Sequence, residues 1–367
     1  MEKWYEYWLD ATKEISSGRK RRWKEQGISA EMLYNIEEIG EKERFLAGIT
    51  DAEELSIKES RKRKNWKDEF EKMKEKGIRM ISWDSKEYPA RLGSLGGMPY
   101  GLYVKGKLPE EDKVSIAIVG ARRCSAYGEK MTLQYAGKLA EAGALIISGM
   151  ALGIDGAAHR GAMNVGGDTF AVLGCGADIC YPKEHMGLYR DLGNKGGILS
   201  EYPPGTPPLS MNFPARNRLI SGLADVVLVM EAKEKSGSLI TADMALEQGR
   251  DIYALPGPAD SVLSKGCNRL ISQGAGILLS PEELCDQLQL LSVEKEKGNG
   301  QNGDKNKIML ETEEDLVYSK LDLFPRSREE LRQLTGLDPE KLSRILISLE
   351  LKGYISERSK NYYFRRI

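Results

Sequence analysis

The stretch that decides the fold is VSIAIVGARRCS, residues 114–125. Its first six residues are almost wholly apolar, which is typical of a buried strand in a parallel sheet covered by helices on both faces. The apolar run ends at Gly120, and the residues that follow have a helical pattern. A strand, a glycine turn and a helix in this order predict the first unit of a doubly wound α/β domain.

Six further strand-like runs follow along the chain and alternate with helical segments. They occupy residues 144–148, 168–173, 197–200, 225–230, 251–255 and 276–279. Repeated alternation of this kind predicts a doubly wound parallel sheet. Residues 78–113 contain extended segments broken by proline and glycine, and we expect them to pack onto one end of this sheet.

Three other regions flank the sheet domain, which we place at residues 78–291. Residues 1–77 are Lys/Glu-rich with a helical pattern, and predict a small helical domain of the SAM or helix-hairpin-helix kind. Residues 292–307 are almost free of apolar side chains and predict a flexible linker. In residues 308–367, a capping box at Ser327 and Glu330, and Asp338 followed by Pro339, predict the starts of two helices. A third helix over residues 310–321 and a final hairpin complete a winged-helix pattern.

The overall composition is that of a globular protein, with 41% hydrophobic and 30% charged residues. The formal net charge is −1, so any binding of nucleic acid must depend on local clusters of charge. The basic runs at residues 19–24 and 61–64 are interpreted as solvated helix faces. Five cysteines without a CxxC pair predict neither a disulfide framework nor a zinc site, and we expect no metal or cofactor. Without a long apolar stretch or an export signal, we expect a cytoplasmic protein with no membrane association.

The loop after the first strand has the features of a phosphate site. Gly120 lets the backbone approach a ligand closely, and Ser125 leads into a helix whose N-terminus favours an anion. Arg122 and Arg123 add guanidinium donors suited to phosphate. We therefore predict that this loop binds phosphate.

Loops after the other strands repeat this chemistry. They supply Ser148, Gly149 and Gly153 after the second strand, Arg216, Asn217 and Arg218 at the expected start of a helix, and Ser236, Gly237, Ser238 and Thr241 after the fifth strand. The carboxyl ends of parallel strands meet at one edge of the sheet, so several such loops side by side suit a backbone with several phosphates. The alternative for any single loop is that its glycines only make a tight turn.

Two nucleotide-binding motifs are missing: the loop after the first strand has no G-x-G-x-x-G, and no G-x-x-x-x-G-K-[ST] occurs in the chain. Asp155 and His159 are four residues apart at the start of a helix, a spacing that would allow a proton-transfer pair. The favoured interpretation is that Asp155 caps the helix and His159 is a buried, hydrogen-bonded residue.

Eight segments together resemble the DNA-processing protein A (Smf) family. They are GARRCSAYG at 120–128, SGMALGIDGAAHRGA at 148–162, CYP at 180–182, SEYPPG at 200–205, FPARNRLISG at 213–222, EAKEKSGSLITA at 231–242, LPG at 255–257 and GCNRLISQGA at 266–275. The resemblance covers residues 78–284 and implies an extended Rossmann-like domain that binds single-stranded DNA, forms a homodimer and loads the RecA recombinase during natural transformation.

The resemblance also implies roles for particular residues. Arg122 and Arg123 would grip phosphates, as would Lys183 after the Tyr181–Pro182 turn. Arg216, Asn217, Arg218, Ser236, Gly237 and Ser238 would line the same pocket. On this account the protein is an interaction protein and not an enzyme.

Two other functions stay open on the sequence alone. One is a nucleotide phosphoribohydrolase on a related Rossmann core, although the stretch at 236–243, SGSLITAD, lacks the glutamate of that group's loop. The other is a transcription regulator whose winged helix reads duplex DNA. Residues 308–367 carry 11 Lys or Arg and 11 Asp or Glu, without the excess positive charge expected of a duplex-binding face, although Arg365 and Arg366 could touch DNA.

Overall fold

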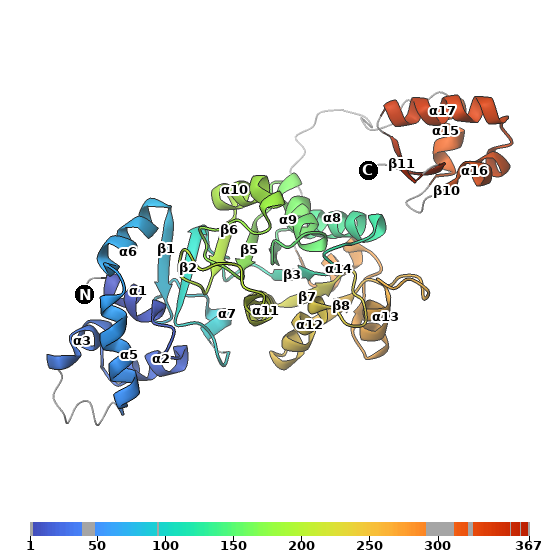
Figure 1. Ribbon diagram of the computed structural model, residues 1–367. Helices are drawn as coiled ribbons and strands as arrows, with labels where there is room; N and C mark the ends of the chain where they lie inside the picture. Colours follow the sequence, from blue (N-terminus) through green and yellow to red (C-terminus); the bar gives the residue numbers. More distant parts are fainter. Residues whose placement is uncertain are drawn as a thin grey trace, which may run out of the picture. The chain divides into compact units, whose positions relative to one another are not determined.

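The computed structural model describes residues 3–38, 48–93, 95–290, 312–321, 326–352, 354–359 and 361–365. The described residues form two compact units. One contains the helices near the start of the chain together with a large sheet, and the other contains the elements near its end (Figure 1). The predicted linker at residues 292–307 lies outside the described residues.

The large sheet contains nine strands among the described residues, in the order β1-β2-β6-β5-β4-β3-β7-β8-β9. Seven of them are parallel, and these are β3 (Ser115–Val119), β4 (Leu145–Ser148), β5 (Thr169–Leu173), β6 (Gly197–Ser200), β7 (Val226–Val229), β8 (Asp251–Ala254) and β9 (Gly276–Ile277). Every residue of β3 to β7 is buried, as expected for strands covered on both faces. The doubly wound α/β fold predicted from the apolar runs is confirmed.

Two antiparallel strands extend the sheet beyond β6. β2 (Gly101–Gly106) pairs with β6, and β1 (Ile78–Ser82) pairs with β2 at the edge. The sequence predicted that residues 78–113 would pack onto one end of the sheet. The structure adds that they continue its hydrogen-bonded ladder.

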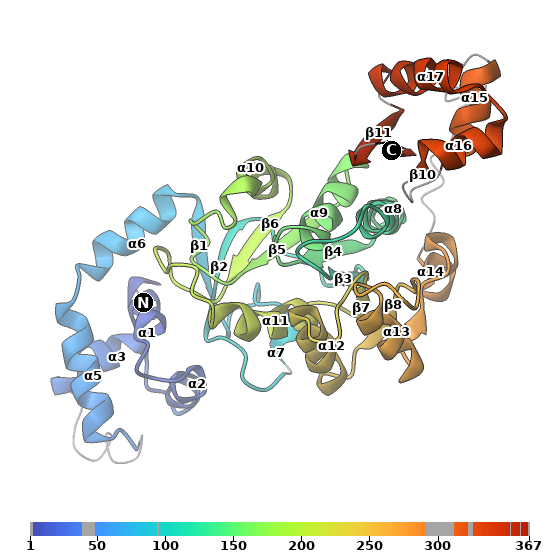
Figure 2. The same cartoon turned by 45° about the vertical axis from the view of Figure 1, so that its right-hand side comes forward.

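Helices cover both faces of the parallel strands (Figures 1 and 2). On one face lie α8 (Ala126–Glu141), α9 (Ile154–Asn164) and α10 (Met186–Lys195), and on the other lie α7 (Ala90–Gly93), α11 (Asn212–Gly222) and α12 (Gly237–Glu247). α13 (Lys265–Ser272) and α14 (Pro281–Gln287) follow β8 and β9. The chain winds from β3 outward to β6 and then crosses to β7 on the other side of β3, so the winding direction changes between β3 and β7.

The helices near the start of the chain share a core with the sheet. They are α1 (Lys3–Ala11), α2 (Ser17–Glu25), α3 (Ala30–Tyr34), the 3₁₀ turn η1 (Ile36–Glu38), α5 (Asp51–Lys62) and α6 (Trp66–Glu75). One continuous hydrophobic cluster joins Tyr7 and Trp8 of α1 to Tyr103 of β2. The rings of Tyr7 and Tyr103 meet edge to face with centroids 6.0 Å apart. These helices are therefore packed against the sheet through a common core.

The second unit has the elements of a winged helix. It contains α15 (Thr312–Ser319), α16 (Arg328–Thr335), α17 (Pro339–Leu351) and a three-stranded sheet of β10 (Arg326–Ser327), β12 (Tyr362–Arg365) and β11 (Ile355–Ser359), in that order. The capping box at Ser327 and Glu330 is present, and Asp338 caps α17 with Pro339 at its first position. The helix expected over 310–321 is described from residue 312, and Arg366 lies outside the described residues.

Candidate functional site

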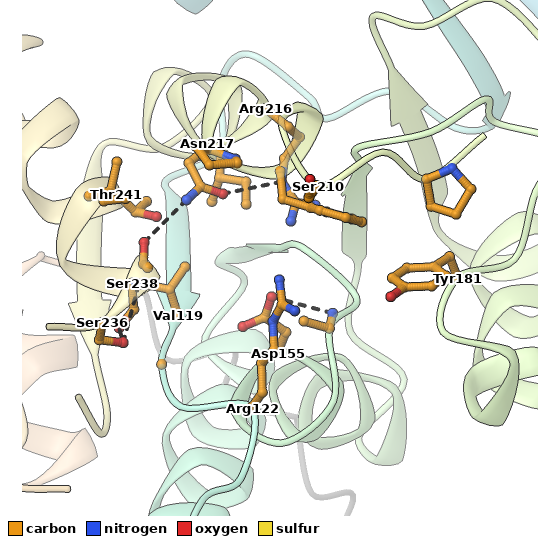
Figure 3. A pocket seen from close by; sticks show the side chains of 18 of the residues that line it. Val119, Arg122, Asp155, Tyr181, Ser210, Arg216, Asn217, Ser236, Ser238 and Thr241 are labelled. Atoms are coloured by element: carbon orange, nitrogen blue, oxygen red, sulfur yellow. Dashed lines mark hydrogen bonds between the residues drawn. The ribbon is translucent and has the colours of Figure 1, made fainter. Parts of the chain in front are cut away.

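A pocket of about 520 Å³ opens where the winding direction of the sheet changes. Its walls come from the loops after β3, β4, β5, β6 and β7, together with the first turns of α11 and α12 (Figure 3). This is the place where open α/β sheets bind their ligands, outside the carboxyl ends of the strands. Loops that the sequence singled out therefore line a pocket at this edge, and their role in binding stays a prediction.

Glycines let two of these loops pack directly against each other. Gly153 has φ +75°, and a Cβ there would lie 2.3 Å from the main-chain oxygen of Ala121. A Cβ on Gly120 would lie 2.6 Å from Cγ1 of Ile154. The sequence predicted that Gly120 allows close approach of a ligand. In the structure, both glycines let the loop after β3 and the loop after β4 approach each other closely. This contact fixes the floor of the pocket.

Arg216 is the buried cation of the pocket. Its side chain is 4% exposed, and its guanidinium donates to the main-chain oxygens of Gly149, at 3.0 Å, and Val172. Burial lowers the pKa of Arg216, and the nearby carboxylate of Asp155 opposes that shift. Arg216 therefore joins α11 to the loop after β4 and to the end of β5, and it supplies a fixed positive charge to the pocket.

Asp155 lies beside this arginine, on the first turn of α9 (Figure 3). The helix begins after Gly153, and no side chain makes the N-cap hydrogen bond, so the prediction that Asp155 caps the helix is wrong in detail. The Asp155 carboxylate accepts instead from the backbone N–H of Ala151, at 3.4 Å. Burial raises the pKa of Asp155, while the positive charge of Arg216 lowers it.

Arg122 and two aromatic rings form a second wall. The guanidinium of Arg122 lies over the ring of Phe213, 5.5 Å from its centroid. The rings of Phe213 and Tyr181 are 5.4 Å apart and tilted by 30°, and Tyr181 is 41% exposed. Aromatic faces next to a guanidinium suit stacked bases and the phosphates that join them.

The third wall is the N-terminus of α12. Ser236 is its N-cap, and the Ser236 hydroxyl accepts from the backbone N–H of Ser238 at 3.4 Å. Asn217 of α11 donates to the main-chain oxygen of Gly237 at 3.3 Å, which ties the two helices together (Figure 3). The remaining N–H groups of a helix N-terminus favour an anion.

The structure brings eight of the fifteen predicted site residues to the pocket. They are Gly120, Arg122, Arg216, Asn217, Ser236, Gly237, Ser238 and Thr241. The sequence placed Arg216, Asn217 and Arg218 at the start of a helix. In the structure they lie further along it, because α11 begins at Asn212. Pro214 occupies the third position of this helix, where a missing N–H costs nothing.

The other seven predicted residues do not line the pocket, and they are Arg123, Ser125, Ser148, Gly149, Gly153, Lys183 and Arg218. Arg218 is the clearest correction, because its guanidinium pairs with Glu201, with Nη1 at 3.0 Å from Oε1. The hydroxyl of Ser148 is buried and donates to the main-chain oxygen of Ile118 at 2.6 Å. Lys183 begins the 3₁₀ turn η2 (Lys183–His185), two residues after Tyr181.

Sequence reasoning missed the aromatic wall and the loop after β6. Tyr181 and Phe213 lie within the motifs CYP and FPARNR, in which the prediction selected the nearby lysine and arginines instead. Pro208, Ser210 and Lys235 also line the pocket. An aromatic residue two or three positions before a basic residue, in a segment that follows a strand, is the signal that could have identified Tyr181 and Phe213.

Asp155 and His159 do not form a proton-transfer pair. Nδ1 of His159 is 2.7 Å from the hydroxyl of Thr169, and burial lowers the pKa of His159 to about 3. The prediction of a buried, hydrogen-bonded histidine is confirmed. Over the described ranges, no group of three or more His, Cys, Asp or Glu is placed to hold a metal ion, and no helix is long and apolar enough to cross a bilayer.

Two family models match the chain. The model for DNA recombination-mediator protein A covers residues 79–289, and the model for the DprA winged helix domain covers residues 305–359. Among curated proteins, Protein Smf of Synechocystis is 34% identical over 328 residues, which is 81% of this chain and 82% of that protein. Protein Smf of Escherichia coli is 46% identical over 211 residues, 57% of this chain but only 56% of the relative.

Solved structures agree with these matches. The X-ray structure of DNA processing protein A from Streptococcus pneumoniae superposes with a TM-score of 0.67 and 34% identity, covering 78% of this chain and 98% of that one. A Helicobacter pylori protein described by its single-stranded DNA binding mode superposes with a TM-score of 0.53 and 31% identity, covering 58% of this chain and 95% of that one. The chain belongs to the DNA recombination-mediator protein A family, also called DprA or Smf.

Proposed function

We propose that the chain binds single-stranded DNA in the pocket between β3 and β7 and delivers the strand to the RecA recombinase during natural transformation and homologous recombination. The protein acts in the cytoplasm as a homodimer and catalyses no reaction on the DNA. The observation that carries the proposal is the combination of Arg122 and the buried Arg216 with the exposed ring of Tyr181 in one open pocket.

Each wall of the pocket supports binding to a strand rather than to one phosphate. The guanidinium of Arg122 and the N-terminus of α12 offer separate sites for phosphates. Tyr181 and Phe213 offer an aromatic surface for a base, which is tolerant of sequence because every base has a π-face. The description of the Helicobacter pylori relative as a single-stranded DNA binder supports the same assignment. Arg123 and Lys183 would contact the DNA backbone outside the pocket.

The arrangement favours a binding protein over the phosphoribohydrolase alternative. Among the described residues that line the pocket, Asp155 supplies the one carboxylate. That carboxylate accepts from a backbone N–H and lies beside the charge of Arg216, which serves the structure of the loop. A glycosidic hydrolysis normally uses two carboxyl groups.

The proposal is tested with Arg122→Ala in a fluorescence anisotropy titration of labelled oligo-dT. We expect binding to weaken by about 1 to 3 kcal/mol, the range for charge-assisted hydrogen bonds, with no change in melting temperature because Arg122 is exposed. Arg190→Ala is the control, since Arg190 is an exposed arginine of α10 that does not line the pocket. Unchanged binding by Arg122→Ala would mean that the strand binds elsewhere.

A further inference from the structure

A second groove, of about 410 Å³, lies between the helices near the start of the chain and the loop after β6. We call it the α6 groove. Its floor is apolar and includes the buried side chains of Tyr7, Trp66 and Met73. Its rim carries five basic side chains, Lys13, Arg63, Lys64, Lys72 and Lys76, all of them exposed.

The positive charge of this rim is only partly balanced. Glu69 is the one carboxylate among the described residues that line the groove, and it lies 3.1 Å from Nζ of Lys72 and 3.9 Å from Nζ of Lys64. Just outside, Glu14 pairs with Arg63 and Asp178 pairs with Lys76, each at 2.7 Å. The Arg63–Glu14 pair is exposed on both sides and contributes little, whereas Asp178 is largely buried beside Lys76. The groove therefore attracts a polyanion.

One loop connects the α6 groove to the pocket between β3 and β7. Residues 203–207 of this loop line the groove, and Pro208 and Ser210 line the pocket. The loop is held in place, because the backbone N–H of Gly205 donates to Asp178 at 2.8 Å and that of Gly176 donates to the oxygen of Thr206 at 2.9 Å. From Pro203 to Pro208 the chain can span at most roughly 18 Å.

We infer that the α6 groove binds the phosphate backbone of the same DNA strand that occupies the pocket, after the strand crosses the loop at residues 203–208. This inference rests on the proposed function. A nucleotide spans at least about 3.4 Å along its strand, so at most about five additional nucleotides cross the loop. The basic residues at 61–64, interpreted from the sequence as a solvated helix face, supply two of the contacts, Arg63 and Lys64.

The test compares oligo-dT of about 6 nucleotides, which fills only one site, with oligo-dT of about 20 nucleotides, which reaches both. The variant Lys64→Ala/Lys72→Ala removes two rim charges. We expect it to weaken binding of the longer strand about tenfold and to leave the shorter strand unaffected. The slope of log affinity against log salt for the longer strand should fall by about 1.4, or about 0.7 for each lost phosphate contact.

The matched control is Lys62→Ala/Lys74→Ala. It removes two exposed lysines from α5 and α6 that do not line the groove. Lys74 pairs with Glu71 at 2.9 Å with the same spacing that joins Lys72 to Glu69, so both variants break an equivalent surface pair. Both strands should bind to this control as they bind to the unmodified protein.

Failure of the inference is distinct from failure of the proposed function. If the unmodified protein binds both strands equally tightly, or if Lys64→Ala/Lys72→Ala binds the longer strand normally, the α6 groove makes no contact and the pocket assignment stands. If Lys64→Ala/Lys72→Ala binds both strands more weakly by the same factor, the groove is not a second contact for the longer strand and the inference is overturned. If neither strand binds to the unmodified protein, the proposed function itself is wrong and the inference falls with it.

Discussion

The guanidinium of Arg216 on α11 donates a hydrogen bond to the main-chain oxygen of Gly149, in the loop after β4, at 3.0 Å. A Cβ at position 149 would lie 2.7 Å from Nη2 of the same arginine, so only glycine allows this contact. The pair couples the loop after β4 to α11, across the carboxyl edge of the sheet. The guanidinium that faces the pocket therefore also stabilises the fold.

Removal of Arg216 should therefore destabilise the protein, unlike removal of Arg122. Arg216→Ala leaves the oxygens of Gly149 and Val172 without their donor and leaves the buried Asp155 without its nearby positive charge. We expect the free energy of unfolding to fall by roughly 3 kcal/mol. Urea unfolding of both variants measures the difference. Equal stability of Arg216→Ala and Arg122→Ala would show that the buried arginine is not structural.

Gly153 should tolerate alanine far less well than another glycine that has the same φ but open space around it. Gly153 and Gly166 both have φ +75°, but a Cβ at Gly166 has no heavy atom within 4 Å. Gly166→Ala should cost only the strain of the left-handed conformation, about 1 kcal/mol, whereas Gly153→Ala adds a clash with the Ala121 oxygen.

We expect Gly153→Ala to lose at least about 2 kcal/mol more stability and to weaken binding of single strands, while Gly166→Ala binds normally. Denaturant unfolding and anisotropy titration measure the two effects. Similar losses in both variants would contradict the role of Gly153 in packing the two loops together.

The stability of the protein should fall in mild acid because of His159. In the folded protein burial holds the pKa of His159 at about 3, below its usual value of 6.5, so the side chain stays neutral. Between these values the unfolded chain binds more protons than the folded one. This contribution to stability is complete above about pH 6.5 and is lost as the pH falls, by up to about 1.4 kcal/mol per pH unit.

His159→Asn keeps a group able to hydrogen-bond to Thr169 but does not titrate. We expect this variant to be less stable than the unmodified protein near pH 7 and to lose less stability between about pH 6.5 and pH 4.5. Urea unfolding at several pH values supplies the comparison. Parallel curves for the two proteins would mean that His159 does not titrate between folded and unfolded states as proposed.

The sequence predicted the sheet and several loops that line the pocket because both depend on local patterns. The apolar run of β3 and the turn at Gly120 are sufficient to recognise a buried parallel strand and its loop. The pairing of β1 and β2 with the edge of the sheet depends instead on contacts between distant residues, and no local pattern distinguishes it from simple packing.

The direction of individual side chains was less predictable. Arg216 and Arg218 are two residues apart on α11, so they project about 200° apart around the helix. One therefore faces the pocket, and the other meets Glu201. The packing of α11 against the sheet decides which arginine faces the pocket, and the sequence interpretation began the helix only at Arg216.

The most direct test of the account compares the affinity of the full chain for oligo-dT of about 20 nucleotides with its affinity for duplex DNA of the same length, at one moderate salt concentration. The account predicts binding to the single strand at least about tenfold tighter, because stacked base pairs hide the faces that Tyr181 and Phe213 would contact, and an affinity that falls steeply with added salt. Equal affinity for both forms, or tighter binding of the duplex, would contradict the assignment of this pocket to single-stranded DNA.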